Sequence, residues 1–229
     1  MTPNSSSPAH PSRPLAATMG MTELARRPMH QAEKPSGPMG VVMGWLLERG
    51  DAMQNRATVE ALEPPPGGAV LEIGFGPGHA LEMLAAARPL SLVAGIDHSE
   101  LMVETARRRL ARSRGYAALD LRCGEVDELP FPDERFDLVY SVNSFHQWPD
   151  KEDALAEMAG VLKPGGDLVL SIRDFRMEGR FEPPGKGAAT AKDAANTMRE
   201  FGLQVRTREV VHSAKRATFL VRGRKCGST

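Results

Sequence analysis

The chain has 229 residues, of which 41% are hydrophobic and 25% are charged, and its formal net charge at pH 7 is zero. This composition is typical of a globular protein, and the balanced charge gives no reason to expect nucleic acid or an acidic membrane surface as a partner. The two cysteines form neither a disulfide framework nor a metal-ligand spacing, and no apolar run reaches the roughly 18 residues of a membrane span. We therefore expect a cytoplasmic protein without a metal site.

The first 66 residues differ in composition from the rest of the chain. Residues 1–38 hold seven of the eighteen prolines, together with serines and little periodic apolar pattern, which predicts disorder. From Met39 onward, apolar residues recur at helical spacing. A second short helix is expected from Gln54 to Leu62, where three prolines follow and stop it. Residues 39–66 are therefore a helical segment ahead of the main domain, which we place at 67–225.

After Gly68 the apolar pattern changes to an alternation of strands and helices. We expect strands at 69–75, 91–97, 118–124, 136–144 and 166–175, and helices at 79–87, 100–113, 150–162 and 191–201. Two more strands, at 203–211 and 217–223, have no helix between them, which predicts an antiparallel hairpin at one edge. The near-continuous apolar strands predict an α/β fold whose largely parallel sheet is covered by helices on both faces.

The first strand runs directly into a glycine-rich loop, Gly74-Phe75-Gly76-Pro77-Gly78. Ligands of such sheets bind at the carboxyl ends of the strands. A dinucleotide fingerprint needs a third glycine where His79 stands, and Pro77 removes a backbone donor that a pyrophosphate would use. The loop therefore favours the close approach of a small ligand, although a tight turn without any ligand gives the same pattern.

A carboxylate stands at the end of the second strand, where Asp97 is expected beside the glycine loop. A carboxylate at this place can accept hydrogen bonds from both hydroxyls of a ribose. Nicotinamide enzymes place an acid here too, and the same residue type caps helices. Asp97 alone therefore leaves two cofactor classes and a structural role open.

Four sequence blocks follow one another along the chain: VLEIGFGPG, GIDHSELMVETARRR, LPFPDERFDLVYSVNSFHQWPD and VLKPGGDLVL. In this order they resemble the class I S-adenosylmethionine-dependent methyltransferases, in particular the small-molecule enzymes similar to those of ubiquinone and menaquinone biosynthesis. The resemblance covers residues 41 to 223. It implies a Rossmann-like fold with a seven-stranded, mostly parallel sheet and S-adenosyl-L-methionine as the cofactor of the domain at 67–225. It also implies that residues 39–66 form a lid, and ordinary packing of these helices on the sheet is the alternative.

The resemblance assigns roles at the methionine end of the cofactor. Gly74, Gly76 and Gly78 are expected to let the backbone pass beside the methionine moiety and the ribose. Glu72 is expected to hold this loop and the amino group of the cofactor through water or backbone. Asn143, just after the fourth strand, is expected to face the methionine end.

The resemblance also assigns roles at the nucleoside end. Asp97 is expected to take the ribose hydroxyls, with His98 and Met102 near the adenine ring. Glu125 is expected to face the adenine amine, with Val126 adding a backbone or apolar contact.

The chemistry needs few reactive side chains, because the sulfonium methyl group is already electrophilic and its transfer depends on alignment and the exclusion of water. A base is needed only when the acceptor must lose a proton. His146, after the fourth strand, is the candidate catalytic residue, and a histidine hydrogen-bonded within a loop is the alternative. Trp148 either walls an acceptor pocket or packs under the loop.

The acceptor is expected to be a small organic molecule. The segment Ser141-Val142-Asn143-Ser144 stands where many nucleobase-amine methyltransferases have an Asn/Asp-Pro-Pro-aromatic motif, so a nucleic acid substrate is disfavoured. Methionines such as Met39 and Met43 suit an apolar or aromatic acceptor. Methyl transfer to such a molecule is the function that the sequence favours. Two alternatives stay open: a module that binds S-adenosylmethionine without catalysis and an NAD-dependent oxidoreductase.

Overall fold

The computed structural model describes residues 52–175, 185–214 and 216–227. The predicted disorder at 1–38 and the helical pattern that starts at Met39 lie outside these ranges. The predicted helix at 54–62 is present at 52–61. No helix within the described ranges has the length and apolar character that a membrane crossing requires.

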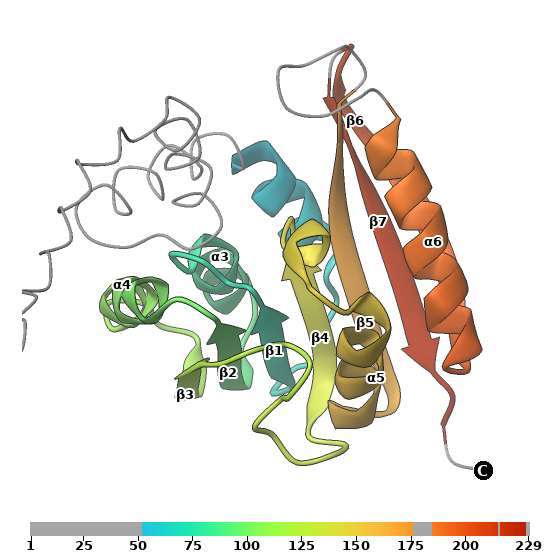
Figure 1. Ribbon diagram of the computed structural model, residues 1–229. Coiled ribbons are helices and arrows are strands. Elements are labelled where there is room, and N and C mark those ends of the chain that lie inside the picture. Colours follow the sequence, from blue (N-terminus) through green and yellow to red (C-terminus); the bar gives the residue numbers. More distant parts are fainter. Residues whose placement is uncertain (1–51, 176–184, 215, 228–229) are drawn as a thin grey trace, which may run out of the picture.

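The described chain forms one seven-stranded sheet with the strand order β3-β2-β1-β4-β5-β7-β6 (Figure 1). The strands are β1 (Ala69–Ile73), β2 (Leu90–Asp97), β3 (Tyr116–Cys123), β4 (Phe136–Val142), β5 (Leu162–Phe175), β6 (Leu203–Ser213) and β7 (Arg216–Lys225). The helices after β1 are α3 (His79–Ala87), α4 (Glu100–Leu110), the 3-10 turn η1 (Phe145–Gln147), α5 (Lys151–Val161) and α6 (Lys186–Glu200). This arrangement confirms the predicted α/β class and the mostly parallel sheet.

The strand pairing places a switch point at the centre of the sheet. β1 pairs in parallel with both β2 and β4. The chain therefore adds β2 and β3 on one side of β1 and then crosses to add β4 and β5 on the other side. β7 is antiparallel to both of its neighbours, β5 and β6, which confirms the predicted hairpin. Within this hairpin, β7 lies between β5 and β6, so the later strand is the inner one. The carboxyl ends of β1, β2 and β4 lie at one edge of the sheet, where ligands of doubly wound sheets bind.

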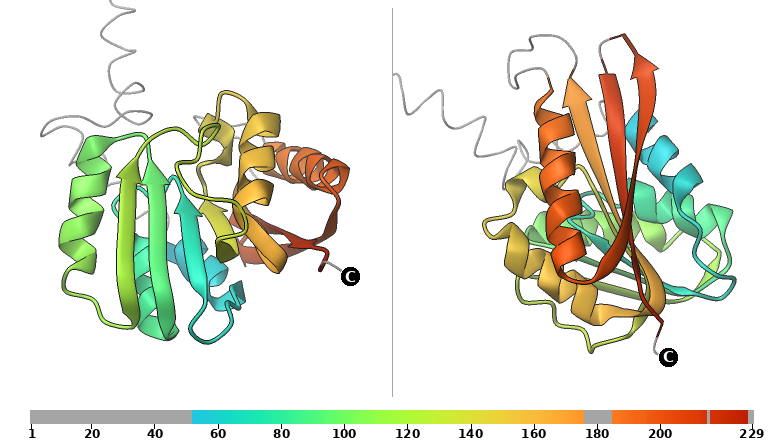
Figure 2. Two further views of the ribbon diagram at one scale, coloured as in Figure 1. Left: turned by 90° about the horizontal axis from the view of Figure 1, so that it is seen from below. Right: turned by 90° about the vertical axis from the view of Figure 1, so that its right-hand side faces the viewer.

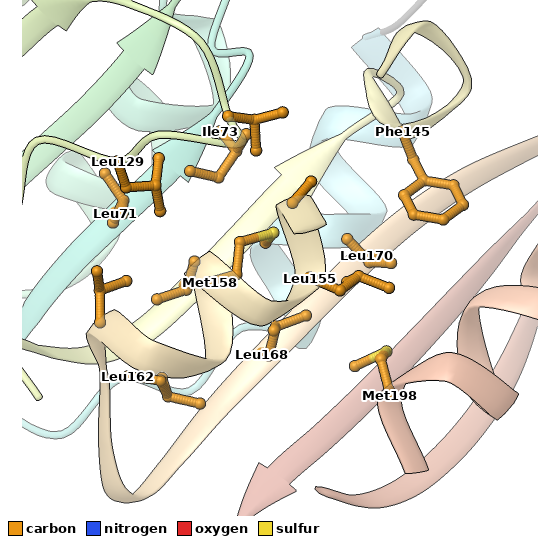
Figure 3. Close-up of a cluster of buried hydrophobic side chains, with 14 of the residues drawn as sticks. Leu71, Ile73, Leu129, Phe145, Leu155, Met158, Leu162, Leu168, Leu170 and Met198 are labelled. Carbon is orange, nitrogen blue, oxygen red and sulfur yellow. The ribbon is translucent and has the colours of Figure 1, made fainter. Parts of the chain in front are cut away.

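Helices cover both faces of the sheet with separate apolar clusters. The helix at 52–61, α3 and α4 pack their buried residues on one face. α5 and α6 pack on the opposite face, and α5 lies in front of the sheet in Figure 1, with α6 on the same side in Figure 2. Figure 3 shows Leu155 and Met158 of α5 beside Leu168 and Leu170 of β5 in this second cluster. The sheet is therefore the shared centre of two cores.

Several element boundaries differ from those predicted. α6 begins at Lys186 and not at Ala191, because Gly185 adopts a left-handed conformation (φ 78°) at the N-cap and starts the helix earlier. α4 ends at Leu110 and not at Ser113. β5 begins at Leu162 and not at Gly166, and residues 163–166 lie between two paired parts of it, because Phe136 of β4 pairs with Leu162 and Leu138 pairs with Asp167.

Candidate active site

The glycine loop between β1 and α3 has a backbone that glycine alone adopts without strain. Gly74, Gly76 and Gly78 have φ values of 66°, 53° and 83°. This left-handed region costs other residues roughly 1–2 kcal/mol each. The Gly74 N–H donates to the Ile96 carbonyl at 2.8 Å, which fixes the loop across the end of β2.

The surroundings of the three glycines differ. A Cβ atom on Gly74 would lie 2.6 Å from the Cβ and Oγ of Ser144, and one on Gly78 would lie 2.8 Å from the Cβ of Ala106 in α4. A Cβ on Gly76 would meet no described atom within 4 Å. Gly74 and Gly78 are therefore required for packing within the protein, and Gly76 is the glycine with open space on its side-chain face.

Asp97 lies against this open part of the loop. Its Oδ2 accepts the Gly76 N–H at 2.8 Å, and its Oδ1 accepts the Ser99 N–H at 2.9 Å. The side chain is 6% exposed. Burial raises the pKa of Asp97, while the hydrogen bonds from Ser99 and Gly76 oppose that rise. The structure thus brings together the glycine loop and the carboxylate that the sequence placed near it.

Glu72, in β1, holds the start of the glycine loop through hydrogen bonds with β4 and α3. It is 2% exposed, and its Oε2 accepts a hydrogen bond from the Tyr140 hydroxyl at 3.0 Å. Burial raises the pKa of Glu72 to about 8; the bond from Tyr140 lowers it, the charge of Asp97 raises it, and the backbone N–H of Leu81 lowers it. Glu72 therefore joins β1 to β4 and to the first turns of α3.

The other residues expected at the nucleoside end lie around Asp97 to different extents. His98 is 29% exposed, with its Nδ1 4.0 Å from the Asp97 Oδ1. Glu125 is exposed. Burial of Asp97 is the main cause that raises its pKa, and the negative charge of Glu125 raises it further. Met102 is buried on α4. The Val126 side chain belongs to the apolar core, which leaves its backbone for any ligand contact.

Asn143 and His146 lie beyond the end of β4, at an open pocket with an empty volume of about 330 Å³. Asn143 has a left-handed backbone (φ 55°), and its N–H donates to the Ser171 carbonyl of β5 at 2.9 Å. His146 is exposed in η1. The described residues that line the pocket are Asn143, Phe145, His146, Ile172, Arg173, Lys186, Gly187 and Thr190.

Trp148 packs under the loop and does not line this pocket. It is buried, and its Nε1–H donates to the Ser144 Oγ at 3.2 Å. Its ring meets that of Phe145 edge-on, with centroids 5.0 Å apart. Of the two roles considered for Trp148, the structure shows the packing one.

Ser144 is a structural residue of the site that the sequence did not single out. Its Oγ donates to the Ile73 carbonyl at 3.1 Å and lies 2.6 Å from the Ser141 Oγ. Together with the contact to Gly74, these bonds hold the segment after β4 against the glycine loop. A serine in a loop carries no pattern that predicts such contacts.

Two cations of the pocket, Arg173 and Lys186, were also absent from the sequence prediction. A signal for Arg173 exists, because it is a charged residue directly after the mostly apolar run 168–172 of β5. Within the ranges that the structure describes, no group of three or more His, Cys, Asp and Glu side chains is placed to hold a metal ion.

Comparison with known proteins finds similarity to methyltransferases. A family model described as a methyltransferase domain matches residues 71–170. The chain is 39% identical over 137 residues to the demethylmenaquinone methyltransferase of Thermus thermophilus, covering 59% of this chain and 56% of that protein. It is 31% identical over 172 residues to an O-methyltransferase of Penicillium expansum, covering 69% of this chain and 61% of that protein. The chain thus spans less than two thirds of the length of both relatives.

A solved structure shows the same fold. The crystal structure of a SAM-dependent methyltransferase from Aquifex aeolicus matches with a TM-score of 0.63 at 19% identity, covering 78% of this chain and 96% of that one. The matched family model runs from Leu71 in β1 through the glycine loop and Asp97 to Leu170 in β5, and so includes the loop and the carboxylate of the site. Residues 71–170 therefore match a methyltransferase domain, and the described chain has the fold of an S-adenosylmethionine-dependent methyltransferase.

Proposed function

We propose that this protein transfers a methyl group from S-adenosylmethionine to a small organic acceptor, with the cofactor bound beside Gly76 and Asp97. The observation that carries the proposal is the pairing of these two residues. Gly76 has open space on its side-chain face and donates its N–H to a buried carboxylate. Each carboxylate oxygen of Asp97 has further lone-pair capacity, so the group can also accept hydrogen bonds from ribose hydroxyls.

The charges around the loop support a cationic ligand. Burial is the main cause that raises the pKa of both Glu72 and Asp97; in addition, the charge of Asp97 raises the pKa of Glu72, and the charge of Glu125 raises the pKa of Asp97. A positive charge beside them favours their ionised forms, whereas a negative charge opposes ionisation. S-adenosylmethionine carries a sulfonium and an ammonium group, while NAD carries a negatively charged pyrophosphate. This difference supports S-adenosylmethionine over the nicotinamide alternative.

The residues of this chain would then have two roles, to bind the cofactor and to align the acceptor with it. Asp97 would hold the ribose, with His98, Met102, Glu125 and the Val126 backbone around the adenine. Glu72 would keep the loop in place through Tyr140 and Leu81. S-adenosylmethionine supplies an electrophilic methyl group, so the remaining requirement is an acceptor held in line and shielded from water.

The pocket beyond β4 is the proposed place of the acceptor. It adjoins the loop through Ser144, and its lining combines the apolar Phe145 and Ile172 with polar side chains such as Asn143. The two relatives named above are methyltransferases, one of demethylmenaquinone and one that methylates oxygen, which agrees with a small acceptor. His146 lines the pocket and is the proposed base for acceptors that must lose a proton.

The test is calorimetric titration of the full chain with S-adenosylmethionine, S-adenosylhomocysteine, NAD and NADP. We expect the two sulfur compounds to bind at micromolar concentration and the nicotinamides not to bind. Asp97→Asn is expected to weaken S-adenosylhomocysteine binding roughly 10- to 100-fold, the range for hydrogen bonds to a charged group. Asp193→Asn, an exposed position on α6, is the matched control.

The outcomes separate the alternatives. Binding of NAD alone, or unchanged binding in Asp97→Asn, contradicts the proposed site. In Asp97→Asn, the amide NH2 would face the N–H of Gly76 or of Ser99, and one of these hydrogen bonds would be lost. Thermal unfolding therefore checks that this variant still folds. Binding of S-adenosylmethionine without transfer of its labelled methyl group to any of a panel of phenols, quinols, amines and carboxylates indicates the non-catalytic module.

A further inference from the structure

We propose that Arg109 of α4 is a positioning residue for the cofactor, because its side chain fixes the backbone of the glycine loop at Pro77. This inference rests on the proposed binding of S-adenosylmethionine and adds a residue to which the sequence assigned no role at the site. Arg109 lies in the last turn of α4, and its Nε donates to the Pro77 carbonyl at 2.8 Å. α4 itself lies beside α3, the helix that follows the loop (Figure 1).

The approach of α4 to the loop is close at two positions of one helix face. Ala106 and Arg109 are three residues apart, so their side chains lie on the same face of α4. A Cβ atom on Gly78 would stand 2.8 Å from the Cβ of Ala106 and 3.9 Å from the Cδ of Arg109. The stem of the arginine therefore lies beside Gly78, and its Nε reaches the carbonyl of the preceding residue.

Pro77 offers one polar backbone group to the rest of the protein. A proline has no N–H, so a backbone hydrogen bond can fix it only through its carbonyl oxygen. Its two neighbours, Gly76 and Gly78, have left-handed backbones. Glycine restricts the backbone least, so a loop of this composition depends on outside contacts to stay in one conformation. The hydrogen bond from Arg109 is such a contact.

Fixing this carbonyl also orients the glycine that we propose faces the cofactor. The ring of Pro77 locks φ, so ψ is the one backbone torsion left between the peptide planes on either side of it. The bond from Arg109 restrains ψ, because it holds the carbonyl oxygen. On the other side of that torsion, the Gly76 N–H is held by Asp97 at 2.8 Å. A loop that is held in this way before the ligand arrives binds the ligand more tightly.

Arg109 also contacts Glu82, in the first turn of α3. Its Nη1 lies 3.2 Å from the Glu82 Oε2, and the Glu82 N–H donates to the Gly78 carbonyl at 3.0 Å. The side chains of Arg109 and Glu82 are 25% and 37% exposed, and an ion pair in such a setting contributes little energy. Glu82 therefore orients the guanidinium, and the bond to Pro77 is the interaction on which we expect cofactor binding to depend.

The experiment replaces Arg109 by two uncharged side chains that reach equally far. In Arg109→Gln the amide nitrogen stands where Nε stood, so it can still donate to the Pro77 carbonyl. In Arg109→Met a methyl group stands there and no donor remains. Calorimetric titration of the full chain with S-adenosylhomocysteine should show about ten-fold weaker binding for Arg109→Met, the size of one hydrogen bond. Arg109→Gln should restore most of this affinity, whereas a role of the charge alone would weaken both variants alike.

The neighbouring Arg108 supplies the matched controls, Arg108→Gln and Arg108→Met. Its side chain is 78% exposed and pairs with Glu104 on α4 itself, so both variants should bind as the wild type does. Thermal unfolding of every variant sets a titration temperature at which all of them are folded.

Three results would overturn the inference: wild-type affinity in Arg109→Met, equal losses in Arg109→Met and Arg109→Gln, or the same loss in Arg108→Met. Each of them leaves the proposed function standing, because the wild type still binds S-adenosylhomocysteine. If the wild type does not bind it, the proposed function fails and the role of Arg109 fails with it.

Discussion

Gly74 and Ser144 are in direct contact across the active site, because a Cβ atom on Gly74 would stand 2.6 Å from both side-chain atoms of Ser144. The contact joins the loop after β1 to the segment after β4. The cofactor loop and the acceptor pocket are therefore held in one geometry by a glycine and a serine that lie 70 positions apart in the sequence.

Gly74→Ala is expected to destabilise the protein by about 2–4 kcal/mol. The added methyl group overlaps Ser144, and alanine would also have to adopt a left-handed backbone. Urea unfolding at equilibrium measures the change in the free energy of unfolding. The double variant Gly74→Ala/Ser144→Gly relieves the overlap and should recover part of the loss. Equal stability of Gly74→Ala and wild type would show that the contact is not a tight one.

Gly76→Ala is expected to abolish cofactor binding with little loss of stability. Its Cβ meets no described atom, so the cost to folding is that of the left-handed backbone alone, roughly 1–2 kcal/mol. The methyl group would fill the space proposed for the ligand. Gly165→Ala is the matched control, because Gly165 also has a positive φ (77°) and open space but lies in the turn within β5. Calorimetry with S-adenosylhomocysteine should separate the two variants, and similar binding by both would contradict the proposed site.

Glu72→Gln is expected to stabilise the protein at alkaline pH and to change little at pH 5. Burial, the largest cause, raises the pKa of Glu72 from 4.5 to about 8. Between these values the folded chain holds a proton that the unfolded chain has lost, so stability falls as the pH rises through this range. The glutamine cannot ionise. It can still accept from the Leu81 N–H while the Tyr140 hydroxyl accepts from its amide.

The difference in the free energy of unfolding between Glu72→Gln and wild type should therefore grow from pH 5 to pH 8. Its upper bound is about 5 kcal/mol, from the size of the pKa shift. Urea unfolding at several pH values measures it, with Glu200→Gln on the exposed end of α6 as the control. A constant difference across the range would mean that Glu72 titrates normally in the folded state.

The sequence predicted the parts of this molecule that local patterns determine. Apolar periodicity located the strands, and the absence of a helix before the last strand predicted the antiparallel hairpin. Gly74, Gly76 and Gly78 were recognised because they form a glycine-rich loop directly after the first strand, and Asp97 because it ends the neighbouring strand at the edge where ligands of such sheets bind.

Other features depend on partners far away in the chain, and the sequence did not predict them. Gln54 bonds to Ser171 and Arg173, which are 117 and 119 positions away. Ser144 meets Ile73 across 71 positions. No local pattern distinguishes these residues from ordinary polar residues of loops and strands. The different environments of the three loop glycines likewise come from Ser144 and Ala106, which belong to later elements.

The place of β7 has a consequence for the order in which the sheet can be completed during synthesis. β6 leaves the ribosome before β7, yet among the described strands it pairs with β7 alone, and one edge of β5 is also unpaired until β7 is available. β5 therefore exposes the unpaired backbone groups of one edge until β7 has left the ribosome. An open strand edge of this kind invites pairing with other chains. Ribosome stalling or premature termination after β6 should thus yield aggregation-prone fragments, even though nearly all of the site has already been made.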